Sequence, residues 1–197
     1  MKFQLDTINT IKDLDTQLFL FFNSKHNEFF DVLMYWVSNK VFWIPFYLFL
    51  FYLAFKQVSK HIWLVALAAA LLILLSDQIS VHAFKNIFQR LRPCHNILIQ
   101  SRVHLLNGHC GGAYGFISSH AANAFALAMF LSLFFKGKYR NFSLFIFCWS
   151  TLVAYSRIYS GVHYPADIIV GAIVGMGIAV AVFKLYTFSE YLIFKPK

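Results

Sequence analysis

The chain has 197 residues, of which 59% are hydrophobic and 24 are phenylalanine, and its formal net charge is +9. This composition and the mean hydropathy of +0.62 exclude a soluble globular fold. Little sequence is left for a further domain, so we expect one membrane-embedded domain over residues 1–197. The basic residues stand in short stretches between apolar segments rather than on one polar face, so nucleic acid is not an expected partner.

The N-terminal segment, residues 1–40, is either amphipathic or partly inserted in the membrane. Its opening residues carry charges and no apolar core, so we expect no cleavable signal peptide. Residues 16–38 mix Leu and Phe with charged side chains. This stretch is compatible with an amphipathic helix on the membrane surface and equally with an imperfect sixth span.

Five apolar segments are candidates for crossing the hydrocarbon layer, which is about 30 Å thick and takes about 20 helical residues. They are residues 42–56, 61–84, 118–135, 142–159 and 165–186. The sequence therefore predicts an all-α integral membrane bundle of five or six transmembrane helices.

Basic residues predict how this bundle is oriented. Lys and Arg gather around residues 56–60 and 136–140, and near the C-terminus at Lys184, Lys195 and Lys197. The positive-inside rule places these regions in the cytoplasm. The connection over residues 86–117 and the other connections that alternate with the basic ones then lie together on the outer face.

Three polar clusters stand on that outer face, each at the edge of an apolar segment. They read Lys85-x6-Arg92-Pro93, Ser118-Ser119-His120 and Arg157-x5-His163-x3-Asp167. Ionisable side chains near a bilayer are costly and therefore point to function. Together they supply cations, imidazoles and a carboxylate that can hold a phosphate and break a P–O bond without a metal ion. Taken singly, each cluster has a structural alternative: interfacial snorkelling cations, a helix cap, or an ion pair of Arg157 with Asp167.

The spacing within two clusters indicates how they can act. Ser118 precedes an apolar run and suits a helix N-cap, where free N–H groups bind phosphate. Asp167 lies four residues after His163, so one helical turn can bring its carboxylate to the imidazole. The other ring nitrogen of His163 is then free to attack.

The helix expected over residues 61–88 would be about 42 Å long. That exceeds the hydrocarbon thickness, so Lys85 near its end reaches the outer interface. If the helix continues to Leu91, Arg92 lies close to the same face. Residues 89–117 then form a long irregular connection, which is typical of a functional loop.

These clusters closely resemble the type 2 phosphatidic acid phosphatase (PAP2) superfamily of membrane lipid phosphatases, whose pattern is K-x6-RP, PSGH and SR-x5-H-x3-D. The first and third pieces match in order and spacing, and the resemblance covers a catalytic motif region over residues 85–167. The second piece departs, with Ile117 in place of Pro and Ser119 in place of Gly. The resemblance implies an all-helical, haloperoxidase-like core with no cofactor and no metal.

By this resemblance, His163 is the nucleophile that forms a phosphohistidine, Asp167 orients it, and His120 protonates the leaving oxygen. The phosphate-binding residues are Lys85, Arg92, Ser118, Ser119 and Arg157. Ser119 still offers its N–H, although a side chain there restricts how closely a substrate approaches the backbone.

The resemblance to compact bacterial members also implies a lipid phosphate substrate, with the surrounding membrane lipids as partners. The site is expected at the outer leaflet of a bacterial-type inner membrane, facing the periplasm or the cell exterior. A polyprenyl diphosphate such as undecaprenyl diphosphate is the preferred substrate; phosphatidic acid, phosphatidylglycerol phosphate and the 1-phosphate of lipid A are alternatives. A non-catalytic lipid-phosphate binding or transport protein would use the same cations without cleavage. The oligomeric state is not predicted.

Two further features concern cysteine and glycine. Cys94 and Cys110 both fall in the outer connection, where an oxidising environment favours a disulfide; the alternatives are free thiols or a metal site with His95, His104 and His109. Gly171 and Gly175 form a G-x-x-x-G step, for which close helix packing within the chain is expected.

Overall fold

The structure, a computed structural model, describes residues 2–194, with side chains from residue 9 onward. Residue 1 and residues 195–197 lie outside this range, including Lys195 and Lys197, which were predicted to be cytoplasmic. The described residues form helices joined by irregular connections and no strand, apart from an isolated β-bridge of Leu91 with Tyr114. The predicted all-α class is confirmed.

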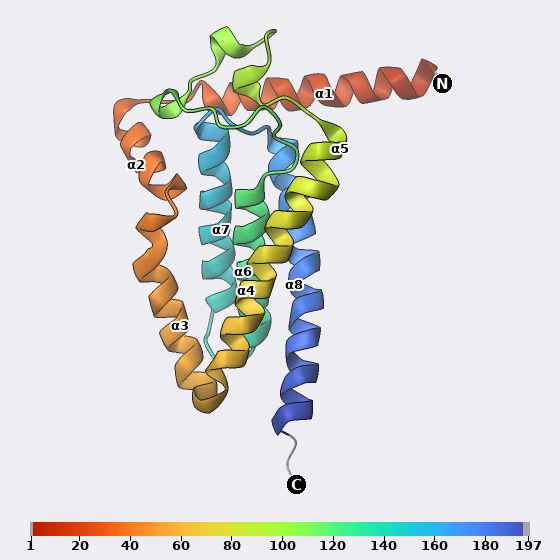
Figure 1. Ribbon diagram of the computed structural model, residues 1–197. Coiled ribbons are helices and arrows are strands. Elements are labelled where there is room, and N and C mark those ends of the chain that lie inside the picture. The colour runs from red at the N-terminus through yellow and green to blue at the C-terminus, as the bar shows by residue number, and fades with distance from the viewer. Residues whose placement is uncertain (1, 195–197) are drawn as a thin grey trace.

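Five apolar helices lie alongside one another and alternate in direction (Figure 1). They are α3 (Ile44–Val58), α4 (Ile62–Gln78), α6 (Ser119–Phe134), α7 (Phe142–Tyr159) and α8 (Pro165–Phe194). Within residues 2–194, three helical runs are long and apolar enough to cross a membrane: Val41–Phe88, Phe142–Tyr159 and Pro165–Phe194. The first run turns back at Ser59–His61 between α3 and α4, and α6 is a shorter apolar helix.

The N-terminal segment combines the two arrangements that its sequence left open. Helix α1 (Lys2–Asn23) lies crosswise over the end of the bundle that also holds residues 89–117 (Figure 1). Helix α2 (Glu28–Ser38) instead turns along the bundle and leads into α3. Residues 16–38 are therefore divided between a crosswise helix and the start of the first lengthwise one.

The side chains of α1 explain its position. Asp15, Phe19 and Asn23, spaced four residues apart, are buried against the rest of the protein. A neighbouring stripe of exposed apolar side chains is made of Ile11, Leu14, Leu18 and Phe21. A helix with one docked face, one apolar face and one polar face suits the surface of a membrane.

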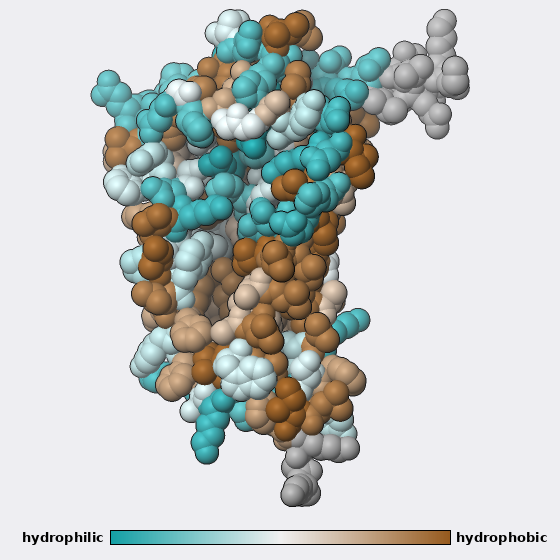
Figure 2. Space-filling model, in the orientation of Figure 1, coloured by the Kyte–Doolittle hydropathy of each residue, from teal (hydrophilic) through white to brown (hydrophobic). Residues whose placement is uncertain are grey.

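The surface of the molecule has a polar end and, along the sides of the helices, an apolar part that we call the shaft. Figure 2 shows polar residues gathered around the end with α1 and residues 89–117, and apolar residues covering the helices beneath. Large exposed apolar side chains on the shaft include Leu48, Leu67, Leu74, Ile173 and Leu185. An apolar surface this extensive is what a lipid-facing bundle presents.

The basic connections lie at the opposite end of the bundle. The end of α3, the α3–α4 turn and the α6–α7 turn are remote from α1 and residues 89–117 (Figure 1). Their basic residues are Lys56, Lys60, Lys136, Lys138 and Arg140. The three polar clusters lie at one end of the bundle and the basic connections at the other, as the order of the connections along the chain predicted.

Helix α8 packs against α6 through two glycines. A Cβ at Gly171 would lie 2.8 Å from the carbonyl oxygen of Ser118, and one at Gly175 would lie 2.1 Å from that of Ala122. Gly177 has open space around it. The G-x-x-x-G step therefore packs within the chain, as predicted.

Candidate active site

His163 lies in the turn between α7 and α8, two residues before Pro165 opens α8. Its side chain is almost fully buried, and Nδ1 lies 3.3 Å from Oδ2 of Asp167, one helical turn later. Because this carboxylate oxygen accepts, we place the imidazole proton on Nδ1. Nε2 is then an unprotonated nitrogen, and it lies 3.2 Å from Nη1 of Arg92.

Asp167 is completely buried and every one of its oxygens is engaged. Besides His163, Oδ2 accepts from the Tyr164 N–H at 3.0 Å. Oδ1 accepts from Nη1 of Arg90 at 2.9 Å, and the backbone oxygen accepts from the Ser118 N–H at 3.0 Å. The carboxylate is thereby held in one orientation toward the imidazole. The sequence patterns do not single out Arg90, which is one of the six residues between Lys85 and Arg92.

Burial lowers the pKa of His163 to about 4, from an ordinary value of 6.5, although the hydrogen bond and the charge of Asp167 act in the opposite direction. The imidazole is therefore neutral at physiological pH. A neutral ring with its proton on Nδ1 has the lone pair of Nε2 available for attack on phosphorus.

Arg92 reaches His163 by a route that differs from the helical one considered above. The helix that follows α4 through the π-helical turn Ile79–Lys85 ends as α5 (Asn86–Phe88), because Gln89 adopts a left-handed conformation with φ of 46°. The condition of a helix continuing to Leu91 is therefore not met. Short backbone pairing of residues 90–92 with 113–115 carries Arg92 back to the site instead.

The guanidinium of Arg92 is fixed by backbone oxygens. Nε donates to the Gly112 oxygen at 2.7 Å, and Nη1 donates to the Val162 oxygen at 3.3 Å. Nη1 also donates to the unprotonated Nε2 of His163, so a transferred phosphoryl group has to take the place of this hydrogen bond. The fork of donors on Arg92 suits phosphate oxygens.

The second cluster forms the N-terminus of α6. Ser118 is the N-cap of this helix and is completely buried, with its Oγ accepting from the Ala121 N–H at 3.4 Å. Nζ of Lys85 donates to Oγ of Ser119 at 2.8 Å. A π-helical turn changes the register of a helix, and such turns are frequent at functional sites. Lys85 ends the turn that leads to this contact.

Arg157 and His120 complete the set of predicted residues. Arg157 donates to Oγ of Ser38, while its buried Nε has no partner among the described residues. His120 lies within electrostatic range of Arg157, His163 and Lys85. The structure thus brings all eight predicted residues, from all three clusters, to one end of the bundle.

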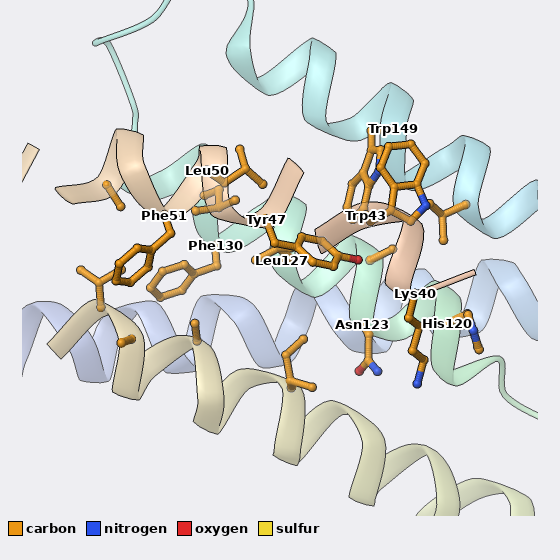
Figure 3. Close-up of a pocket in the computed structure, with 18 of the residues that line it drawn as sticks. Lys40, Trp43, Tyr47, Leu50, Phe51, His120, Asn123, Leu127, Phe130 and Trp149 are labelled. Atoms are coloured by element: carbon orange, nitrogen blue, oxygen red, sulfur yellow. The ribbon is translucent and has the colours of Figure 1, made fainter. Parts of the chain in front are cut away.

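An apolar cavity of about 360 Å³ leads away from His120 between α3, α4, α6 and α7. In Figure 3, Lys40, Asn123 and His120 lie beside one another at one end, and Leu50, Phe51 and Phe130 line the other. Lys40 adds a cation that the sequence patterns did not single out. The cavity joins a polar mouth at the active site to an apolar interior.

Gly115 is a further residue whose importance the sequence did not reveal. A Cβ there would lie 3.1 Å from Cγ of Arg92, 3.4 Å from Oδ2 of Asp167 and 3.5 Å from Nδ1 of His163. The absence of a side chain lets residues 113–115 lie directly on the His163–Asp167 pair.

Cys94 and Cys110 form a disulfide, with Cα atoms 6.0 Å apart, as one of the sequence alternatives predicted. His95 lies near the two sulfur atoms, and its Nε2 is 3.1 Å from the Gly111 oxygen. Sulfur atoms bonded to each other are not thiolate ligands, so this cluster does not suit a metal ion. His104 instead pairs with Asp31 at 2.9 Å, away from the cysteines.

Comparison with known proteins decides the family. The model of the PAP2 superfamily matches residues 64–191. The chain belongs to the PAP2 superfamily. The matched region contains all eight residues of the candidate active site.

Two proteins of known name are similar to this chain over most of their length. A lipid A 4'-phosphatase of Bacteroides thetaiotaomicron is 40% identical over 173 residues, covering 85% of this chain and 75% of the relative. A lipid A 4'-phosphatase of Porphyromonas gingivalis is 37% identical over 183 residues, covering 91% and 76%. Family and relatives together identify this PAP2 protein as a lipid phosphatase.

Two crystal structures share the PAP2 fold. LpxE of Aquifex aeolicus superimposes with a TM-score of 0.61 at 25% identity, covering 85% of this chain and 93% of LpxE. A transmembrane PAP2-type phosphatidylglycerolphosphate phosphatase from Bacillus subtilis gives a TM-score of 0.67 at 17% identity, covering 90% and 86%. The predicted PAP2-like helical core is confirmed.

Proposed function

We propose that this PAP2 protein is a metal-independent lipid A 4'-phosphatase that acts through a phosphohistidine. The observation that supports the mechanism most directly is the unprotonated Nε2 of His163, held by Asp167 and facing the guanidinium of Arg92. The observation that supports the substrate is the similarity to two lipid A 4'-phosphatases over most of this chain.

In the first chemical step, Nε2 of His163 attacks phosphorus and the bond from phosphorus to the sugar oxygen breaks. His120 transfers a proton to the departing sugar oxygen. Burial and the nearby charges of Arg157 and Lys85 disfavour the protonated imidazole in the empty site, and the negative charge of the bound phosphate offsets them. Lys85, Arg92 and Arg157 face the charge that grows on the equatorial phosphoryl oxygens, together with the N–H groups at the start of α6. Positioned donors of this kind cost little reorganisation when the charge develops.

In the second step, a water molecule attacks the phosphohistidine and inorganic phosphate leaves. His120, now neutral, accepts a proton from this water and returns to its starting form. The imidazole of His163 is restored as the N–P bond breaks. A covalent intermediate divides one difficult hydrolysis into two easier displacements.

The surroundings of His120 support a lipid substrate. The side of the site that would receive the leaving group opens into the apolar cavity between α3, α4, α6 and α7. Acyl chains attached to a sugar leaving group suit such a space. Lys40 at its mouth adds positive charge beside a substrate that is anionic.

This substrate differs from the undecaprenyl diphosphate preference drawn from the sequence. The named relatives favour the lipid A alternative, at the 4' position rather than at the 1 position considered above. Lipid A with both phosphates supplies a single test molecule for the two positions. We further propose that the site faces the outer leaflet of the inner membrane, since the basic connections lie at the other end.

The test is phosphate release by the purified protein in detergent with EDTA, from bisphosphorylated lipid A, undecaprenyl diphosphate and phosphatidic acid. Mass spectrometry of the lipid A product distinguishes loss of the 4'-phosphate from loss of the 1-phosphate. We expect release from the 4' position, and none from His163→Ala. Faster release from undecaprenyl diphosphate would overturn the substrate, and binding of every lipid without release would indicate the non-catalytic protein.

A further inference from the structure

Arg90 contacts two carboxylates and an aromatic ring next to the residues proposed for catalysis. Nη1 donates to Oδ1 of Asp167 at 2.9 Å, and Nη2 donates to Oδ2 of Asp15 at 2.6 Å. The guanidinium carbon also lies 3.9 Å from the centre of the Tyr164 ring. Each end of its planar fork is thus occupied by a carboxylate, and its face is stacked on an aromatic ring.

Asp15 extends this arrangement to α1. It is only 7% exposed, on the docked face of a helix that lies across the end of the bundle. Its second oxygen, Oδ1, accepts from the N–H of Ala166 at 2.9 Å in the first turn of α8. Asp15 therefore holds both Arg90 and the chain segment from which Asp167 projects.

The electrostatic reason for Arg90 lies in the burial of Asp167. A fully buried carboxylate is costly unless a cation and hydrogen bonds compensate its charge. Arg92 lies on the His163 side of the site, where the phosphate would bind, whereas Arg90 contacts the carboxylate oxygen turned away from His163. The two arginines, two residues apart, thus serve opposite faces of the His163–Asp167 pair.

We infer that Arg90 and Asp15 are positioning residues, forming an Asp15–Arg90–Asp167 relay that couples the crosswise helix α1 to the orientation of His163. The inference rests on the proposed roles of His163 and Asp167. Arg90 compensates the charge of Asp167 and holds its Oδ1, so that Oδ2 stays directed at Nδ1 of the imidazole. Asp15 fixes Arg90 in that position from α1.

The first test uses Arg90→Ala with the full-length protein and bisphosphorylated lipid A. We expect kcat to fall by about 10- to 100-fold, the effect found for residues that orient metal ligands, and KM to change little because the phosphate-binding residues remain. The Arg90 side chain is 26% exposed, so free guanidinium ion can enter the vacated space. Guanidinium is expected to restore part of kcat, while urea does not.

The second test addresses the link to α1. Asp15→Asn keeps an oxygen that can accept from Ala166 but removes the charge facing Arg90. We expect kcat to fall by a few-fold in the wild-type background and not to fall further in the Arg90→Ala background, because the two residues act through one chain of contacts. Matched controls are Asp13→Asn on the exposed face of α1 and Arg102→Ala in the outer connection, both expected to retain full activity.

The outcomes separate the relay from the proposed function. If His163→Ala is inactive but Arg90→Ala retains full kcat, the relay is wrong and the proposed function stands. If His163→Ala is itself active, the proposed function is wrong, and the relay that rests on it is wrong with it. A loss of kcat in Arg90→Ala that guanidinium does not restore, or losses in Arg90→Ala and Asp15→Asn that multiply in the double variant, would overturn the relay.

Discussion

The two histidines of this active site lie in opposite surroundings. His163 is buried and in contact with Asp167 and Arg92, and each of these residues is in turn bonded to further groups. His120 lines a cavity, and the neighbouring Arg157 has a buried Nε without a partner among the described residues. The nucleophile side is thus held by hydrogen bonds before substrate arrives, whereas the leaving-group side has polar groups and space that a substrate would fill.

This difference corresponds to what each step needs. A nucleophile gains most from being held in one tautomer and one orientation, since misalignment raises the barrier directly. A general acid must meet the oxygen of a large lipid, and the room for that lipid is the cavity itself. Changes on the nucleophile side should therefore affect every substrate, and changes on the other side should depend on the leaving group.

The largest expected effect separates the two histidines by leaving group. His163→Ala should lose at least about 10⁴-fold of activity toward every substrate, because no other group replaces the nucleophile. His120→Ala should slow lipid A hydrolysis by about 10² to 10⁴-fold but spare the attack on p-nitrophenyl phosphate, whose leaving group needs no proton. Phosphate and p-nitrophenol release, measured side by side, check this difference. Equal losses for both leaving groups in His120→Ala would contradict its role as acid.

The next effect tests how tightly the nucleophile side is packed. Gly115→Ala places a Cβ 3.1 Å from Cγ of Arg92, so either the loop or the arginine must shift. We expect kcat to fall by about 10- to 100-fold, since small displacements near reacting groups are costly. Gly112→Ala in the same loop is the matched control, because its Cβ would meet no atom within 4 Å. A Gly115→Ala enzyme as active as this control would show that the nucleophile side is more tolerant than proposed.

A smaller effect concerns pH. With the pKa of His163 lowered to about 4, its neutral form persists on acidification, so kcat/KM should have no acid limb near 6.5 from this residue. Between about pH 8 and pH 5 we expect less than about a two-fold fall in kcat/KM for p-nitrophenyl phosphate, whose leaving group does not need the proton of His120, after correction for titration of the substrate phosphate. The correction comes from phosphorus NMR of the free substrate. A residual fall of about 30-fold would indicate an imidazole with an ordinary pKa.

The smallest effect on kcat is expected for a change at Ser119, next to His120 in the sequence. Ser119→Gly removes the oxygen that accepts from Lys85 and restores the residue usual in the PAP2 pattern. We expect kcat to change by less than about three-fold, because the backbone N–H and the Lys85 ammonium both remain. Relative rates on lipid A and phosphatidic acid would show whether the added space alters substrate choice. A loss as large as that of Gly115→Ala would mean that the two sides are equally constrained.

Much of this architecture follows from the sequence because it depends on local patterns. The spacing of His163 and Asp167 predicts their contact through one helical turn, and Ser118 predicts the start of α6. The alternation of apolar segments with basic connections predicts that the three clusters meet at one end. Each of these inferences uses residues close together in sequence or a rule that applies to whole segments.

The rest depends on contacts between distant segments that leave no local pattern. Asp15 is 75 residues from Arg90, and their pairing exists only because α1 lies across the bundle. Gly115 appears in the sequence as one of several loop glycines, and only the folded site shows what its missing side chain permits. The left-handed Gln89 ends a helix that the apolar pattern alone does not end.

The most direct test of the central claim is to trap the covalent intermediate on His163. Enzyme in detergent with EDTA is mixed with lipid A labelled with ³²P at the 4' position, quenched in alkali and digested for mass spectrometry. The account predicts an alkali-stable, acid-labile label on the peptide containing His163, absent from His163→Ala. Phosphate release with no labelled enzyme, or a label on another residue, would contradict it.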